Sequence, residues 1–173
     1  MRKLLESFLE WTLIILMVVL TTVVIVAVIF RKLDASLSWY DEVASILLSW
    51  VTYYGAALAA LKRKHIGFDS VLLSIPMPAR MVAAAIAEIL VLAFFVLLAW
   101  AGWQVLQVLE GDTLVSLTFV PVQFTQSVIP IGATLFIICE LISLPSYWKS
   151  VAAGRSLEHM EIEEEIERAK SAC

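Results

Sequence analysis

Three glutamates stand in or at the edge of long apolar stretches, and they are the residues of this chain best suited to do chemistry. They are Glu42, Glu88 and Glu140. An ionised carboxylate costs a few kcal/mol or more inside a lipid bilayer, so each one needs a partner, a water-filled cavity or a proton. Such residues mark ion pathways, proton relays, or hydrogen bonds between helices or subunits.

The positions of these glutamates favour contact roles over transport. Glu42 opens an apolar run beside Asp41, and a carboxylate in the first turn of a helix is favoured by the helix dipole, so we expect a capping or docking role. Glu88 and Glu140 lie short of the midplane, where coupled-ion sites usually sit. We therefore favour a hydrogen bond between helices or subunits over an ion pathway. Because no basic residue is expected at their depth, we predict that each is protonated or paired with another chain.

Histidine and cysteine indicate no metal, haem or nucleophilic site. His65 and His159 both lie outside the apolar runs, which excludes a haem held by two histidines within a membrane. Cys139 lies inside an apolar run and Cys173 ends the chain, without the spacing of a metal site. There is also no glycine-rich phosphate loop. We expect no catalytic residue, no metal and no cofactor on this chain, and we expect that it is not an enzyme.

The composition places these residues in lipid. Of the 173 residues, 61% are hydrophobic and 16% are charged, whereas soluble domains have about 45–50% and about 25%. A water-soluble monomer of this size could not bury so much apolar surface. This excludes a soluble enzyme, a protein that binds nucleic acid and a disordered chain.

Four apolar runs are long enough to cross a bilayer, which takes about 20 residues in a helix. The runs are continuous, whereas the strands of a membrane barrel would alternate. The predicted fold is an all-α integral membrane protein with helices over about 9–31, 40–61, 81–109 and 124–148. Pro130 is expected to open or kink the fourth helix, because proline lacks an amide hydrogen. Residues 1–148 would form the membrane domain and 149–173 a charged cytoplasmic tail.

Basic residues predict the orientation, because short cytoplasmic loops carry an excess of lysine and arginine. With both termini inside, ten basic residues are cytoplasmic and only Arg31 and Lys32 are outside. Most tryptophans and tyrosines lie near the span ends, as in an interfacial belt. Trp50 lies near the middle of the second span, where we expect a packing role.

The segment 62–80, between the second and third spans, predicts a helix at the membrane surface. Four apolar residues have the spacing of one helical face: Phe68, Val71, Leu72 and Ile75. We expect a short interfacial helix over about 69–76, capped by Asp69 and lying in the plane of the inner leaflet. An apolar loop packed beneath the helices is the alternative.

The segment 111–132, between the third and fourth spans, is apolar and contains Pro121 and Pro130. We expect an extended or re-entrant outer segment that leads into the fourth helix. Backbone at membrane depth must be paired or covered by protein, so we expect a second membrane protein to cover this segment.

Two stretches together resemble a known family. In SWYDEVASILLSWVTYYGAALAALKRKHIGFDSVLLSIP the matching residues are Trp39, Glu42, Gly55, Arg63, His65, Ile66, Asp69, Leu72 and Pro76. In SLTFVPVQFTQSVIPIGATLF they are Ser116, Leu117, Pro121, Ile129, Pro130, Ile131 and Gly132. In this order, within a four-span chain, they resemble the small membrane subunit of tripartite ATP-independent periplasmic (TRAP) transporters, the DctQ-like family, over residues 1–148.

The resemblance implies an accessory subunit in the bacterial inner membrane that braces a large, multi-span transport subunit and holds no substrate itself. It also implies a periplasmic binding protein that delivers an organic acid, such as a carboxylate or a sialic acid. Na⁺ would bind to the large subunit rather than to this chain. Membrane lipids are the remaining partners. The residues that we expect to serve subunit contacts or structure are Trp39, Glu42, Trp50, Arg63, His65, Asp69, Glu88, Pro121, Pro130 and Glu140.

Two other interpretations stay open on the residues alone. One is a four-span membrane enzyme or assembly factor that binds a lipid or a quinone near Trp100, Trp103 and Glu110. The other is a small homo-oligomeric exporter. Since the spans carry few polar residues that could line a path, we favour the accessory subunit.

The orientation can be tested with single cysteines in a chain from which both natural cysteines have been removed. Ser38→Cys and Asp112→Cys are expected to react with a membrane-impermeant thiol reagent added outside whole cells, because both positions lie in outer loops. Ser156→Cys is expected to react only after the cells are opened. Outside labelling at position 156 with protection at position 112 would reverse the orientation.

Overall fold

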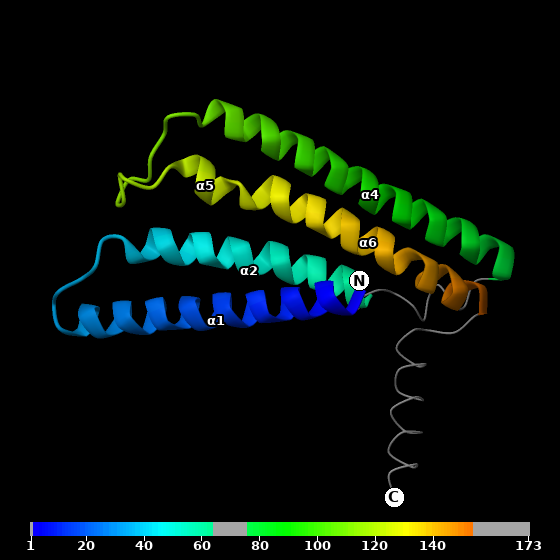
Figure 1. Ribbon diagram of the computed structural model, residues 1–173, viewed down its shortest axis with the longest axis horizontal. Helices are drawn as coiled ribbons and strands as arrows, with labels where there is room; N and C mark the ends of the chain where they lie inside the picture. Colours follow the sequence, from blue (N-terminus) through cyan, green and yellow to red (C-terminus); the bar gives the residue numbers. More distant parts are fainter. Residues whose placement is uncertain (1, 64–75, 154–173) are drawn as a thin grey trace, which may run out of the picture.

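The computed structural model describes residues 2–63 and 76–153, which form four long helices and one short helix (Figure 1). The helices are α1 (Arg2–Lys32), α2 (Tyr40–Lys62), α4 (Met77–Val108), α5 (Val122–Gln126) and α6 (Val128–Ala153). Within this part of the chain, α1, α2, α4 and the stretch formed by α5 and α6 are each long and apolar enough to cross a membrane. For these residues, the prediction of a helical protein with four helices that are able to span a membrane is therefore confirmed.

Two predictions fall largely outside the described residues. The interfacial helix expected over 69–76 is described only at Pro76, which has an extended backbone and forms the N-cap of α4. The expected cytoplasmic tail is described only up to residue 153, and this first part of it continues α6.

The helices are longer than the apolar runs that predicted them. α1 starts at Arg2 rather than near residue 9, and α4 starts at Met77 rather than near residue 81. An apolar run measures the part of a helix that lies in lipid, whereas hydrogen bonding continues the helix into charged flanking sequence. Pro78 does not prevent the early start of α4, because the first turn of a helix needs no amide donor there.

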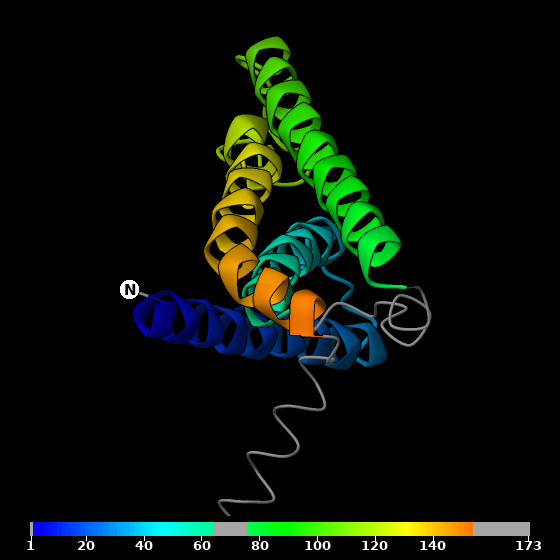
Figure 2. The ribbon, with the colours of Figure 1, turned by 90° about the vertical axis from the view of Figure 1, so that its right-hand side faces the viewer.

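The four long helices form an open row in the order α1, α2, α6 and α4 (Figures 1 and 2). α2 packs against α1 and α6, and α6 packs against α4. α1 and α4 thus form the two edges of the row. The fold is an open row in which only the two middle helices have a neighbour on both sides.

The four helices have their ends on two opposite sides of the molecule, and these two sides differ in composition (Figure 1). One end, called here the basic end, carries Arg2, Lys62, Arg63, Arg80 and Lys149. The other end, called here the loop end, carries the connections over residues 33–39 and 109–121. Charged side chains from different helices can therefore meet at the basic end.

A small core fills the contact of α1, α2 and α6. Its buried residues are Leu9, Ala57, Ala60, Leu61, Phe136 and Cys139. Phe95 of α4 stacks on Phe136 with ring centroids 3.6 Å apart, which extends this core to the fourth helix of the row. Most other large apolar side chains of α1 and α4 remain exposed, and these outer faces suit lipid or a second membrane protein.

Glycines allow close approach at two of the three helix contacts in the row, α2–α6 and α6–α4. A Cβ atom added at Gly132 of α6 would lie 2.6 Å from the Cβ of Tyr53 in α2. One added at Gly102 of α4 would lie 2.8 Å from Cγ2 of Ile129 in α6. Small residues at such contacts let helix backbones approach in lipid, where packing replaces the hydrophobic effect as the source of association.

We predict that Gly132→Ala separates α2 from α6. The added methyl group meets Tyr53 at a distance that neither side chain tolerates, so the free energy of unfolding should fall by about 1–3 kcal/mol. Gly55→Ala is the matched control, because its methyl group would lie an ordinary 3.9 Å from Cδ2 of Leu13. Denaturant unfolding in micelles, followed by tryptophan fluorescence, measures the free energy of unfolding of both variants. Equal stability of the two variants would contradict the close contact.

Candidate functional site

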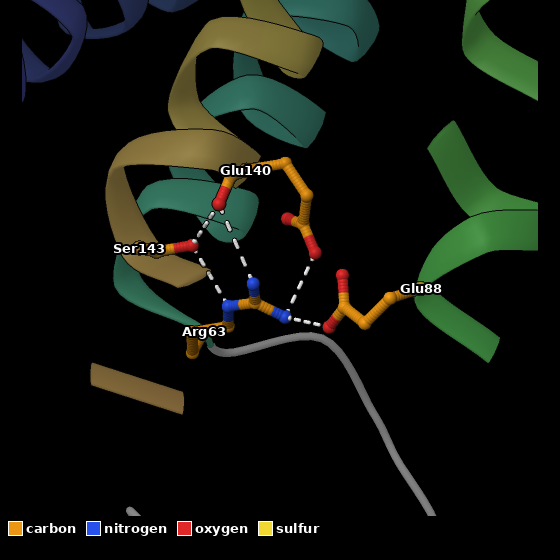
Figure 3. A network of polar contacts seen from close by, with 4 residues as sticks. All are labelled: Arg63, Glu88, Glu140 and Ser143. Carbon is orange, nitrogen blue, oxygen red and sulfur yellow. Dashed lines mark hydrogen bonds and ion pairs between the residues drawn. The ribbon is translucent and has the colours of Figure 1, made fainter. Parts of the chain in front are cut away.

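Arg63 brings carboxyl groups from two other helices together at the basic end (Figure 3). It follows the last residue of α2 and has a left-handed backbone, with φ of 53° and ψ of 31°. Its amide donates a hydrogen bond to the carbonyl of Ala60, which closes the helix. Beyond this turn, the side chain reaches Glu88 of α4 and Glu140 of α6.

The guanidinium group of Arg63 has partners on several sides (Figure 3). Its Nη1 atom forms ion pairs with Oε1 of Glu88 and, at 2.8 Å, with Oε1 of Glu140. Its Nε–H donates to Oγ of Ser143 at 2.7 Å, and Nη2 donates to the carbonyl of Glu140 at 3.4 Å. The Tyr147 ring lies 4.5 Å from Cζ, which adds a cation–π contact.

These charged groups are buried. The side chains of Arg63, Glu88 and Glu140 are 11%, 10% and 5% exposed. Ser143 is fully buried, and its hydroxyl donates to the carbonyl of Glu140 at 2.9 Å. In such surroundings the two charges of an ion pair attract each other strongly. Removal of one partner leaves the other charge buried, where water cannot reach it. We call Arg63, Glu88, Glu140 and Ser143 the arginine cluster.

The arginine cluster corrects one prediction from the sequence. A hydrogen bond between helices or subunits was expected for Glu88 and Glu140, and the structure places both in contacts between helices. The expectation that no basic residue lies at their depth was wrong, because Arg63 of the same chain pairs with both. The position of Arg63 along the sequence places it at the end of α2, but its left-handed turn and long side chain let it extend to the neighbouring helices.

A second ionic group at the basic end joins α1 to α2. Lys62 forms ion pairs with Glu6, at 3.3 Å, and with Glu10. The guanidinium of Arg2 donates to the carbonyl of Leu61 at 3.4 Å. About a third of each side chain in the lysine pairs is accessible, so water screens them and each is worth about 0–1 kcal/mol.

Glu42 holds the tip of a hairpin at the loop end. The amides of Val115 and Ser116 donate to its two carboxylate oxygens at 3.0 and 2.9 Å. The hydroxyl of Ser116 also donates to the carbonyl of Ser38 at 3.2 Å. Glu42 therefore docks a distant loop instead of capping its own helix.

The hairpin that Glu42 holds spans residues 112–122. It contains an isolated antiparallel bridge between Thr113 and Pro121, and the amide of Leu114 donates to the carbonyl of Val120 at 3.0 Å. This agrees with the extended conformation expected there. The partners of these amides come from this chain, while Val115 and Phe119 remain 89% and 80% exposed.

Trp39 and Trp50 lie along α2. Trp39 is the N-cap of this helix and makes no capping hydrogen bond with its side chain. The Trp50 ring lies 5.7 Å from that of Tyr54 and 6.2 Å from that of Phe124, between α2 and α5.

The two candidate prolines occupy helix starts, and the remaining candidates lie outside the described residues. Pro121 is the N-cap of α5, and Pro130 lies in the first turn of α6, so it opens this helix. Pro145 is the proline in the helix interior. His65 and Asp69 lie outside the described residues.

Ser143 and Tyr147 were missed by the sequence analysis. They follow Glu140 by three and seven residues, a spacing that places all three side chains on one face of a helix. This spacing could have identified them as neighbours of the glutamate. Tryptophans Trp100 and Trp103, named for a lipid or quinone site, are exposed on the outer face of α4.

We predict that Arg63→Gln is strongly destabilising, because the two carboxyl groups lose their common counter-charge inside the protein. The expected loss is about 3–5 kcal/mol of unfolding free energy. Lys62→Gln changes the preceding residue and its more exposed ion pairs, so it should cost about 1 kcal/mol or less. Thermal unfolding in micelles compares the two. Similar losses would show that burial of the arginine cluster contributes little.

We also predict that Glu42→Ala releases the hairpin tip. The amides of Val115 and Ser116 lose their acceptors, so their hydrogen exchange should become severalfold faster, while amides in the middle of α6 stay unchanged. Asp41→Ala is the control, because Asp41 is an adjacent, exposed carboxylate. Hydrogen exchange read by mass spectrometry tests this. Unchanged exchange at residues 115 and 116 would show that the loop keeps its shape without Glu42.

Comparison with protein families gives a match to residues 17–149. The matching family is described as "Tripartite ATP-independent periplasmic transporters, DctQ component". The matched range includes Glu42 and the whole arginine cluster. The comparison with curated proteins finds no match.

Proposed function

Because this chain belongs to the DctQ component family of tripartite ATP-independent periplasmic transporters, we propose that it is the small subunit that braces the large transport subunit. Membership makes it a component of a transporter, and its four helices make it a multi-pass protein of the inner membrane. Bracing, sodium coupling and the class of solute are the parts that we propose.

The open row of helices is the observation that supports a bracing role. A path through a membrane must be enclosed by helices, whereas here the contacts run in one line from α1 through α2 and α6 to α4. The outer faces of α1 and α4 carry large, exposed apolar side chains. Such a row offers a broad surface on which a larger membrane protein can pack through van der Waals contact.

Contacts across the row support its use as a fixed scaffold. Arg63 joins α2 to α4 and α6 through buried charge, and Lys62 joins α2 to α1. Gly132 allows α6 to approach α2, and Gly102 allows α4 to approach α6. A subunit that must hold its place while its partner moves benefits from such cross-links, because each helix is held by more than lipid contact.

The substrate is proposed to bind elsewhere in the complex. The large subunit would bind Na⁺ and an organic acid of the carboxylate or sialic acid class, and a periplasmic binding protein would deliver the acid. The basic end is proposed to face the cytoplasm, since short cytoplasmic segments carry the excess of basic residues. The loop end, with the hairpin held by Glu42, would then face the periplasm and the binding protein.

Reconstitution in liposomes tests the accessory role. The purified chain alone should move no labelled organic acid under an inward sodium gradient. Together with the large subunit and the binding protein it should support uptake, and a potassium gradient of equal size should not. Omission of this chain should abolish uptake while the large subunit still binds its solute.

Two outcomes would contradict this function. Sodium-driven uptake by the purified chain alone would favour the exporter. Full uptake by the large subunit and binding protein without this chain would show that no brace is required.

A further inference from the structure

The arginine cluster contains one basic group and two acidic groups, so its positive and negative charges do not balance if all three groups are ionised. One guanidinium group, which stays protonated in proteins, faces the two carboxyl groups of Glu88 and Glu140. If both carboxyl groups were ionised, one negative charge would remain inside the protein without a counter-ion. Uncompensated charge in such surroundings is strongly unfavourable.

Within the part of the chain that the structure describes, Arg63 is the only basic residue in an ion pair with Glu88 or Glu140. Lys62 pairs with Glu6 and Glu10 on the α1 side of α2. On α4, Arg80 donates to Sδ of Met77, and among the residues described no ion pair joins it to either glutamate. On α6, the neighbour Cys139 is buried and has only a thiol.

The hydrogen bonds of the arginine cluster are also incomplete. Nη1 of Arg63 pairs with the Oε1 atom of each glutamate. Its Nε donates to Oγ of Ser143, and its Nη2 donates to the carbonyl of Glu140. The second oxygen, Oε2, of both Glu88 and Glu140 is buried, and no hydrogen-bond donor reaches it within residues 2–63 and 76–153. A buried acceptor without a donor costs about 1–3 kcal/mol.

The two carboxyl groups lie against each other beside the same nitrogen of Arg63. Figure 3 shows the free oxygen of Glu88 turned towards the carboxyl group of Glu140. Two carboxylates that share a site in this way repel each other, and such pairs hold one proton in common. That proton removes the extra charge and supplies an O–H donor between the two groups.

We propose that Glu88 and Glu140 form an intramembrane proton-binding site that holds one proton between them, with Arg63 as the counter-ion of the carboxylate that remains. A metal ion is the other cation that could balance the charge. It would need more oxygen ligands, and the described residues contain no group of three or more metal-binding side chains. The arginine cluster is therefore neutral, and its proton links α4 to α6.

Infrared spectroscopy of the full chain in lipid nanodiscs tests this site directly. With ¹³C-labelled glutamate, we expect a C=O stretching band of a protonated carboxylic acid that shifts with the label. Glu88→Gln and Glu140→Gln should each abolish this band, because the carboxyl group that remains then ionises against Arg63. The control Glu10→Gln, at the exposed pair with Lys62, should leave the band unchanged.

Stability provides a second measurement on the same variants. Glutamine keeps the arginine cluster neutral and offers an N–H donor in place of the acid O–H, so each single variant should unfold near the wild-type midpoint. The double variant leaves Arg63 buried without a counter-ion and should unfold at a clearly lower temperature. A wild-type chain without the acid band, or a band that persists in both single variants, would overturn the proposal.

Discussion

The buried contact between Arg63 and the two glutamates is the interaction on which the arrangement of α2, α4 and α6 depends. Helices in lipid gain nothing from the hydrophobic effect when they associate, so only packing and polar contacts fix their order. In this chain Gly132 and Gly102 allow close packing at the α2–α6 and α6–α4 contacts, and Arg63 supplies the polar contact that joins the end of α2 to α4 and α6. Because this contact is buried, it is strong, and it favours this arrangement of α2, α4 and α6 over others.

The two ends of the row use charge in different ways. At the basic end, charge is buried and joins long helices, so its strength comes from the exclusion of water. At the loop end, the Glu42 carboxylate binds two backbone amides near solvent, so it gives shape to a hairpin more than it gives stability to the fold. This division suits a scaffold that is rigid within the membrane and offers a defined surface at one end.

The sequence predicts the spans better than their surroundings. Runs of apolar residues identify the four helices that are able to span a membrane in the described part of the chain. They do so because a helix must have about 20 apolar residues to cross a bilayer. The same runs misplace the starts of α1 and α4, since helical hydrogen bonding continues beyond lipid. Pro130 shows the limit of local rules: proline allows either a kink or a start, and only the fold selects the start.

The acidic residues of the candidate site could be predicted from the sequence, but the groups that bind them could not. An acid in an apolar run is conspicuous, so Glu42, Glu88 and Glu140 could be named from sequence. Their partners are backbone amides, which have no signature in sequence, and an arginine whose reach depends on a left-handed turn. The roles of Gly102 and Gly132 likewise depend on which helices become neighbours in the row.

The place of Arg63 along the chain has a consequence for biosynthesis. It ends the first helical hairpin, and its partners Glu88 and Glu140 follow 25 and 77 residues later. At a translation rate of about 5–20 residues per second, the second glutamate is made roughly 4–15 s after the arginine. During this interval the guanidinium group has to stay hydrated at the membrane surface. The arginine cluster therefore closes only when the last helix arrives, which makes it a late step in the assembly of the nascent chain.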